Sequence, residues 1–284
     1  MPEAKALPRK SAFRGGLVAI TAAALGLGFW ISVSLAGDAE YPGWNDAPDP
    51  QGPQGEAIAL GRRVLTKTTQ NAPAYSGNAL NCTSCHLNAG RTQWSSPWVG
   101  IWGVFPEYRS RSARVISLQD RINDCFERSM NGKALPPASP EMIGILAYMQ
   151  WLSRDVPTGQ SVTGRGFVRM KSKQPPDRER GARIYAQQCA GCHGEQGQGM
   201  PDASGEMLYP PLWGPKSFNI GAGMARLNTA AAFVKANMPF DRPGSLSDEE
   251  AFDVAAFFTR QPRPDFAGKS ADWAQGGKPE DARY

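Results

Sequence analysis

Two copies of one short motif could carry redox chemistry in this sequence. Each has the pattern C-x-x-C-H, and the residues they supply are Cys82, Cys85, His86, Cys189, Cys192 and His193. This pattern is the attachment signature of c-type haem: two thiols at that spacing reach the two vinyl groups of one porphyrin, and the adjacent imidazole becomes an iron ligand. A zinc site needs further Cys or His ligands at matching spacing, and a thioredoxin-like pair needs no histidine. The sequence therefore predicts two covalently bound haem c groups.

Few residues remain that could serve as distal iron ligands. The chain has only two histidines, and both belong to the motifs. Neither iron is therefore expected to have two histidine ligands, and no histidine is left for acid–base catalysis. Four of the five cysteines also belong to the motifs, which leaves Cys125. The distal ligands must come from methionine, Cys125 or lysine, or be absent.

Met238 is the predicted distal ligand of the second haem. It lies in an Asn-Met-Pro sequence, 45 residues after His193 and just before the last predicted helix. A thioether opposite histidine favours ferrous iron and raises the reduction potential, which suits an electron carrier. Methionine is also a common core residue. The alternatives among the nine methionines are therefore Met200, Met207 and Met224.

Cys125 has three possible roles. It could be an inert buried side chain, a disulfide partner between two chains, or the distal ligand and reactive group of the first haem. Met130, 44 residues after His86, is the competing ligand. Cations near a thiol favour its thiolate form and attract sulfur oxyanions, so the arginine-rich surroundings favour the third role. These arginines are Arg109, Arg111, Arg114, Arg121 and Arg128.

The N-terminus predicts export. The net charge is +5, but residues 1–36 hold four basic side chains and one acidic one, so the rest is nearly neutral. This balance gives no support to nucleic-acid binding. Residues 15–37 are uncharged and mostly apolar, and Ser34-Leu35-Ala36 offers a cleavage site. The apolar run is also long enough for a membrane span. We expect residues 1–37 to be a signal peptide or a membrane anchor, with the body periplasmic, either secreted or tethered to the inner membrane.

A helical pattern flanks each motif. One helix begins near Glu56, before the first motif, and a second begins at Pro140 after the N-cap Ser139 and stops near Asp155. Residues 178–188 form the helix before the second motif. A capping box at residues 247–250 starts a final helix that runs through Phe258.

The spacing of these elements is an internal repeat. Glu141 lies 55 residues after His86, and Asp248 lies 55 residues after His193. The sequence therefore predicts an all-α chain of two tandem cytochrome c domains of the class I type. We expect an N-terminal domain at 38–160, a linker at 161–177 and a C-terminal domain at 178–284. The tail after Gln261 has no assigned structure.

The residues around Cys125 resemble those of a known family. The segment RINDCFERSMNGKALP, preceded by SSPWVGIWGVFPEYRSR and followed by SPEMIGILAYMQWLS, is similar to the dihaem thiosulfate dehydrogenases that form tetrathionate. The similarity covers roughly residues 55–262. It implies that the first haem, with ligands His86 and Cys125, is the active site. It also implies that the second haem, with His193 and Met238 available, passes electrons outward.

The resemblance also implies a substrate site. Arg111 and Arg121 would hold the thiosulfate dianion, and Gln93 and Ser129 would donate hydrogen bonds. One position departs from the family: some members have a lysine before the methionine that matches Met238, whereas this chain has asparagine. Ligand switching that depends on that lysine is therefore not expected here.

The implied reaction joins two thiosulfates into tetrathionate, and the reverse reaction would use the same site. Electrons would pass to a periplasmic or membrane-bound acceptor such as another cytochrome c. Two other functions stay open: a non-catalytic dihaem electron carrier with Met130 as the first distal ligand, and a cytochrome that conjugates thiosulfate to a carrier protein. A dihaem peroxidase is a weaker alternative, because its haem iron would need an additional histidine ligand.

Overall fold

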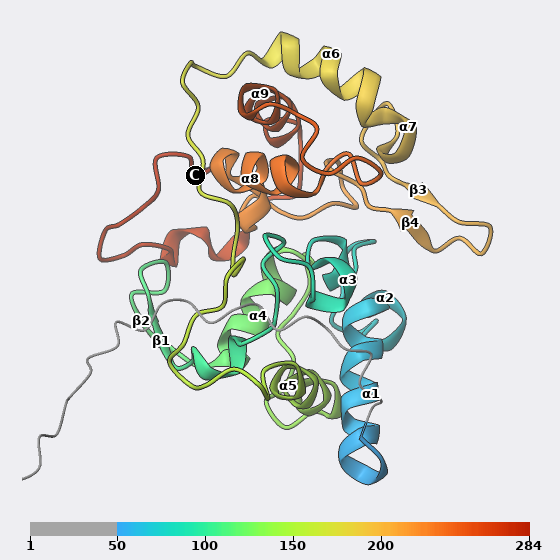
Figure 1. Cartoon of the computed structure of the whole chain (residues 1–284), viewed down its shortest axis with the longest axis vertical. Helices are drawn as coiled ribbons and strands as arrows, with labels where there is room; N and C mark the ends of the chain where they lie inside the picture. Colours follow the sequence, from blue (N-terminus) through green and yellow to red (C-terminus); the bar gives the residue numbers. More distant parts are fainter. Residues whose placement is uncertain (1–49) are drawn as a thin grey trace, which may run out of the picture. The chain divides into compact units, whose positions relative to one another are not determined.

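The computed structural model describes residues 50–284, and most of the regular structure in this range is helical (Figure 1). The predictions for residues 1–37 lie outside the described residues. The helices of the first half are α1 (Gly52–Thr66), α2 (Thr68–Asn71), α3 (Leu87–Gly90), α4 (Leu118–Arg128) and α5 (Pro140–Leu152). Those of the second half are α6 (Arg178–Gln188), α7 (Ala190–His193), α8 (Leu227–Asn237) and α9 (Asp248–Thr259). Short 3-10 turns lie at Cys82–Ser84, Ile101–Gly103, Gly223–Ala225 and Ala267–Ala271.

Two short antiparallel sheets, which the all-α prediction did not include, interrupt the helices. The first pairs β1 (Glu107–Arg109) with β2 (Arg114–Ile116), and the second pairs β3 (Met200–Pro201) with β4 (Met207–Tyr209). Strands of two or three residues are too short to give an alternating pattern that a sequence reveals. Their main effect is to shape loops, because the turn between β1 and β2 carries Arg111.

The predicted starts of α5 and α9 are confirmed. The Ser139 hydroxyl accepts a hydrogen bond from the Met142 N–H at the start of α5, where Pro140 occupies the first turn. Ser247 and Glu250 form the capping box of α9. Helix α1 begins at Gly52, four residues before the predicted start, because Pro53 in its first turn supports an earlier beginning.

In each half, the helix before the haem motif packs against the last helix of that half (Figure 1). Helices α1 and α5 meet at Gly61 and Gly144, where a Cβ on Gly61 would lie 1.9 Å from the Gly144 carbonyl oxygen. Helices α6 and α9 meet at Gly181, where a Cβ would lie 2.0 Å from the Asp253 carbonyl oxygen. Because backbone lies against backbone at both crossings, neither position has room for a side chain.

We therefore expect Gly61→Ala to destabilise the protein, by about 1–3 kcal/mol or more, since the two helices must separate to admit the methyl group. Thermal unfolding followed by far-UV circular dichroism measures the loss. Gly223→Ala is the matched control, because this glycine lies outside both C-x-x-C-H motifs and a Cβ there meets nothing within 4 Å. Equal melting temperatures for Gly61→Ala and the wild type would contradict this packing.

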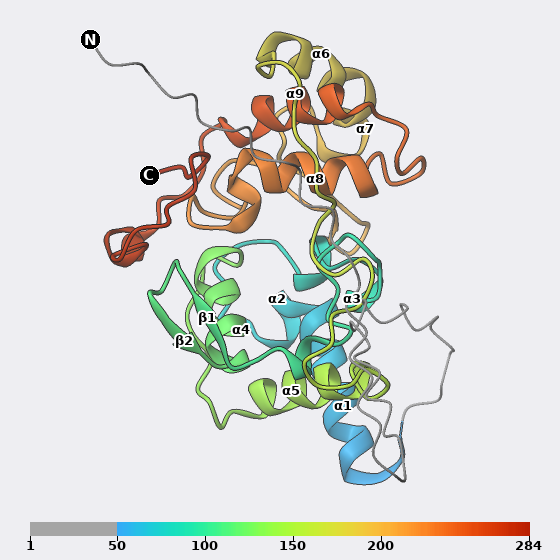
Figure 2. The same cartoon turned by 60° about the vertical axis from the view of Figure 1, so that its left-hand side comes forward.

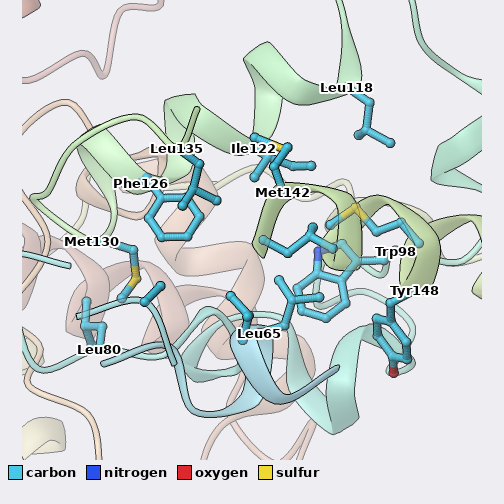
Figure 3. Close-up of a cluster of buried hydrophobic side chains, with 14 of the residues drawn as sticks. Leu65, Leu80, Trp98, Leu118, Ile122, Phe126, Met130, Leu135, Met142 and Tyr148 are labelled. Atoms are coloured by element: carbon cyan, nitrogen blue, oxygen red, sulfur yellow. The ribbon is translucent and has the colours of Figure 1, made fainter. Parts of the chain in front are cut away.

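The main core of the first half contains Tyr148, Trp98 and Phe126 (Figure 3). Tyr148 is fully buried, and its hydroxyl donates a hydrogen bond to the Ala89 carbonyl at 2.9 Å. Phe218 of the second half also belongs to this cluster. A second cluster is formed by α6, α8 and α9 with partly buried Cys189 and Met238 against it; its largest buried members are Trp213, Phe252, Phe258 and Tyr185.

The tail that the sequence left unassigned packs against the first half. The Trp273 N–H donates to the Arg111 carbonyl at 2.8 Å, so the C-terminal segment lies beside the turn between β1 and β2 (Figure 2). The Asp272 carboxylate of this segment accepts two hydrogen bonds from Arg128 of α4. No helix within residues 50–284 is long and apolar enough to cross a membrane.

Candidate functional site

The first C-x-x-C-H motif presents an imidazole suited to binding iron. The His86 Nδ1 lies 2.6 Å from the Ser96 carbonyl oxygen. A nitrogen at this distance donates its hydrogen to the carbonyl, which leaves the Nε2 lone pair free for a metal. Burial lowers the pKa of His86 to about 4, so the ring is neutral at physiological pH. Trp98 packs on this ring, with 4.9 Å between the ring centroids.

The second motif repeats this arrangement. The His193 Nδ1 lies 2.9 Å from the Pro210 carbonyl oxygen, and burial lowers the pKa of His193. The cysteines of both motifs are free thiols rather than disulfide partners. Two thiols beside an imidazole with a free Nε2 are the donor set that haem c requires, so both motifs fit this cofactor.

The backbone after the first motif is strained. Asn88, Ala89, Trp94 and Ser96 all have positive φ values, between 50° and 61°. Side chains other than glycine rarely adopt this conformation, and such residues gather at functional sites. Here the strained segment delivers the Ser96 carbonyl to His86, so it orients the imidazole.

Helix α4 positions Cys125. Ser117 and Asp120 form a capping box at its start, and Leu118, Ile122 and Phe126 follow at four-residue spacing as its buried face. Arg121 and Cys125 therefore lie one turn apart on another face. One contact defines this second face: the Arg121 Nη1 donates a hydrogen bond to the Cys125 Sγ at 3.0 Å.

Cys125 also lies near the first motif. Burial raises the pKa of Cys82 and of Cys85 to about 12, and the negative charge of Cys125 contributes to both shifts. The charge of Arg121 contributes to the lowered pKa of His86, after the larger effect of burial. The Arg121–Cys125 pair is thus close enough to influence both thiols and the imidazole of the motif.

Cys125 lines a pocket of about 230 Å³ that is rich in arginine. Asp124 and Ser129 also line it, as do Trp273 and Pro279 of the C-terminal segment. Its five arginines are Arg109, Arg111, Arg121, Arg128 and Arg226. A thiol in a pocket of guanidinium groups is suited to binding a small sulfur oxyanion and forming a bond to it.

Four residues of the predicted substrate site meet in this pocket, namely Cys125, Arg111, Arg121 and Ser129. Gln93 does not line it. The Gln93 side chain lies beside Gly164, where a Cβ on Gly164 would come within 2.7 Å of it. The roles assigned to these five residues remain predictions.

Sequence reasoning missed the contribution of the C-terminal segment. The buried Asp272 carboxylate accepts two hydrogen bonds from Arg128, at 2.8 and 2.9 Å, and lies 3.7 Å from Arg111. The Tyr284 hydroxyl also donates to Asp272. No local signal could have revealed these contacts, because Asp272 and Arg128 are 144 residues apart in the chain.

The two methionines considered as iron ligands, Met238 for the second haem and Met130 as the rival of Cys125 at the first, lie in different cores. Met238 follows α8 and packs against the second cluster, which also contacts Cys189. Met130 is almost fully buried in the first cluster. Asn237, which precedes Met238, donates hydrogen bonds to the carbonyls of Phe233 and Trp94. Its amide is therefore engaged by backbone rather than directed to a ligand.

Comparison with known proteins identifies the class of protein. Residues 69–158 match the family described as "SoxA/TsdA, cytochrome c domain", and residues 176–258 match "Cytochrome C oxidase, cbb3-type, subunit III". Two helical domains with these matches, each presenting a C-x-x-C-H motif, define a c-type cytochrome with covalently bound haem c.

The relatives narrow the class further. The thiosulfate dehydrogenase of Psychrobacter arcticus is 46% identical over 81% of this chain and 70% of its own length. That of Allochromatium vinosum is 44% identical over 91% of this chain and 100% of its own length. A structure of thiosulfate dehydrogenase (TsdBA) from Marichromatium purpuratum is 39% identical with a TM-score of 0.76; the match covers 80% of this chain and 50% of that longer one. The chain belongs to the thiosulfate dehydrogenase family.

Proposed function

We propose that this protein oxidises two thiosulfates to one tetrathionate at Cys125, and that it does so in the periplasm. The observation that carries the proposal is the Cys125 thiol, which accepts a hydrogen bond from Arg121 at 3.0 Å and lines a pocket with five arginines. The charge of Cys125 also acts on both thiols of the first motif. The names of the relatives support thiosulfate as the substrate.

Two haem c groups would be held by the two motifs, through the thiols and the Nε2 atoms of His86 and His193. Cys125 would be the distal ligand at the first site and Met238 at the second. When bound, the haems supply acceptors for the two electrons of the reaction, with the thioether-ligated iron at the higher potential.

The protein residues then perform two bond-forming steps. First, the Cys125 sulfur, once it no longer binds iron, forms a bond to the outer sulfur of one thiosulfate, and the two electrons released by this oxidation would pass to the two haems. Second, the outer sulfur of another thiosulfate attacks the outer sulfur of this adduct, tetrathionate leaves, and the Cys125 thiolate is restored. Arg121 and Arg111 bind the dianion, and covalent capture divides one difficult step into two easier ones. The same steps in reverse would reduce tetrathionate.

Product analysis tests the function. Purified full-length holoprotein, incubated with thiosulfate and ferricyanide, should form free tetrathionate without any partner protein. A cytochrome that conjugates thiosulfate to a carrier would form none until the carrier was added, and a simple electron carrier would not consume thiosulfate. The natural acceptor is expected to be another cytochrome c or a membrane-bound carrier.

A separate prediction concerns Met238. Met238→Ala should lower the midpoint potential of the second haem by an amount on the order of 0.1 V, because the thioether favours ferrous iron. Redox titration followed by visible spectroscopy measures this shift. Met200→Ala is the control, since Met200 is 40% exposed on β3. A potential unaffected by Met238→Ala would mean that another residue is the ligand.

A further inference from the structure

The arginines of the Cys125 pocket differ in how their charges are balanced. Arg109 lies 3.3 Å from Glu107, and Arg111 and Arg128 share the Asp272 carboxylate. Guanidinium groups already paired with carboxylates attract a further anion less strongly. These three arginines therefore contribute less free positive charge to the pocket than their number implies.

Two arginines of the pocket have no carboxylate at ion-pair distance within residues 50–284. One is Arg121, which donates to the Cys125 Sγ. The other is Arg226, which precedes α8 and comes from the second half of the chain. Its Nη2 donates to the Thr229 hydroxyl at 3.3 Å, and its Nε is buried without a hydrogen-bond partner.

A buried guanidinium N–H without a hydrogen-bond partner destabilises the protein, and a bound oxyanion would supply the missing acceptor. Arg226 thus has both features of an anion-binding residue: a charge that no carboxylate balances and a donor that no protein group satisfies. Because it lines the same pocket as Cys125, an anion bound to it would lie next to the reactive sulfur.

We infer that Arg226 forms a second anion subsite, which binds the attacking thiosulfate and the far sulfonate of tetrathionate. This inference rests on the proposed function, whose reaction brings two dianions into one pocket. Their sulfonates repel each other, so the second needs a cation distinct from the one at Cys125. Arg121 and Arg111 bind the first thiosulfate, and Arg226 binds the second.

Arg226 acts only in the second step, in which the incoming thiosulfate attacks the Cys125 adduct. In that step a bond forms between the outer sulfurs of the adduct and of the incoming thiosulfate, and the bond from Cys125 Sγ breaks. The electron pair of the broken bond returns to Sγ as the thiolate, so the step needs no oxidant and no proton. Capture of the first thiosulfate, which loses two electrons to the haems, does not use Arg226.

The variant Arg226→Gln tests whether Arg226 acts in adduct resolution and not in adduct formation. Oxidised holoprotein is mixed with one equivalent of thiosulfate, and the adduct on Cys125 is measured by intact mass spectrometry. Excess thiosulfate is then added, and adduct decay and tetrathionate release are followed. Arg226→Gln should form the adduct as the wild type does but resolve it about tenfold more slowly, with a higher KM for thiosulfate. Arg226→Lys should recover part of this loss.

Arg242→Gln is the matched control, because Arg242 is exposed, pairs with Asp241 and does not line the pocket. Unchanged visible spectra and melting temperatures establish that the variants are folded. If the wild type makes tetrathionate and Arg226→Gln resolves its adduct at the wild-type rate, the inference is wrong and the proposed function stands. If Arg226→Gln forms no adduct, Arg226 belongs to the first subsite and the inference is again wrong. A wild type that makes no tetrathionate overturns the proposed function itself.

Discussion

Cys125→Ala should reduce kcat/KM for thiosulfate by about 10³-fold or more, because Cys125 alone, among the described residues that line the pocket, carries a sulfur that could form the adduct. The substitution makes a partly buried side chain smaller and leaves the buried face of α4 intact. Ferricyanide reduction with thiosulfate as donor measures the activity, and tetrathionate is determined in the same samples.

Met130→Leu is the control for the competing interpretation of the first haem. Met130 is 2% exposed, and leucine conserves most of its volume, so folding should be retained. We expect this variant to keep near wild-type turnover. If Cys125→Ala retained turnover while Met130→Leu lost it, Met130 rather than Cys125 would be the sulfur that turnover requires, and the assignment of Cys125 as the reactive group would be wrong.

Arg121→Gln should lower kcat/KM by about 10- to 100-fold, which corresponds to the loss of one charge-assisted hydrogen bond. Arg121 donates to the Cys125 Sγ at 3.0 Å, and the negative charge of Cys125 raises the pKa of Arg121. Loss of the guanidinium therefore removes a group that stabilises the thiolate and, in our proposal, binds the first thiosulfate. Steady-state kinetics over a range of thiosulfate concentrations measure the effect.

Arg114→Gln is the matched control for Arg121→Gln. Arg114 belongs to the same arginine-rich stretch, but its side chain is 58% exposed and pairs with Asp120 outside the pocket. Exposed ion pairs contribute little to protein stability, so the activity and the stability of the Arg114→Gln variant should hardly change. Equal losses in the two variants would mean that the general positive charge of this region, rather than the Arg121 contact, supports activity.

The sequence predicted the parts of the protein that depend on local chemistry. C-x-x-C-H fixes the position of thiols and imidazole within one turn, and the structure adds the Ser96 and Pro210 carbonyls that orient the two rings. The caps at Ser139 and Ser247 are confirmed, because a cap depends on a hydroxyl and the next turn of backbone alone. Arg121 and Cys125 are four residues apart, so their contact follows from helix geometry.

The rest of the pocket depends on contacts between distant segments. Asp272 reaches Arg128 across 144 residues, and Arg226 enters from the second half of the chain. Charge in a Pro- and Gly-rich tail gives no indication of its partner, so the sequence left this segment unassigned. Gln93, in contrast, is assigned to the substrate site by resemblance but does not line the Cys125 pocket. Its side chain lies beside Gly164.

The most direct test of the central claim is the identity of the sulfur on the first iron. Thiolate ligation gives a distinctive low-spin EPR signal and near-infrared bands, which oxidised holoprotein should display. The signal should persist in Met130→Leu and disappear in Cys125→Ala. A signal that survives Cys125→Ala, or spectra in which both irons have methionine ligands, would contradict the assignment of Cys125 as the reactive group of the site.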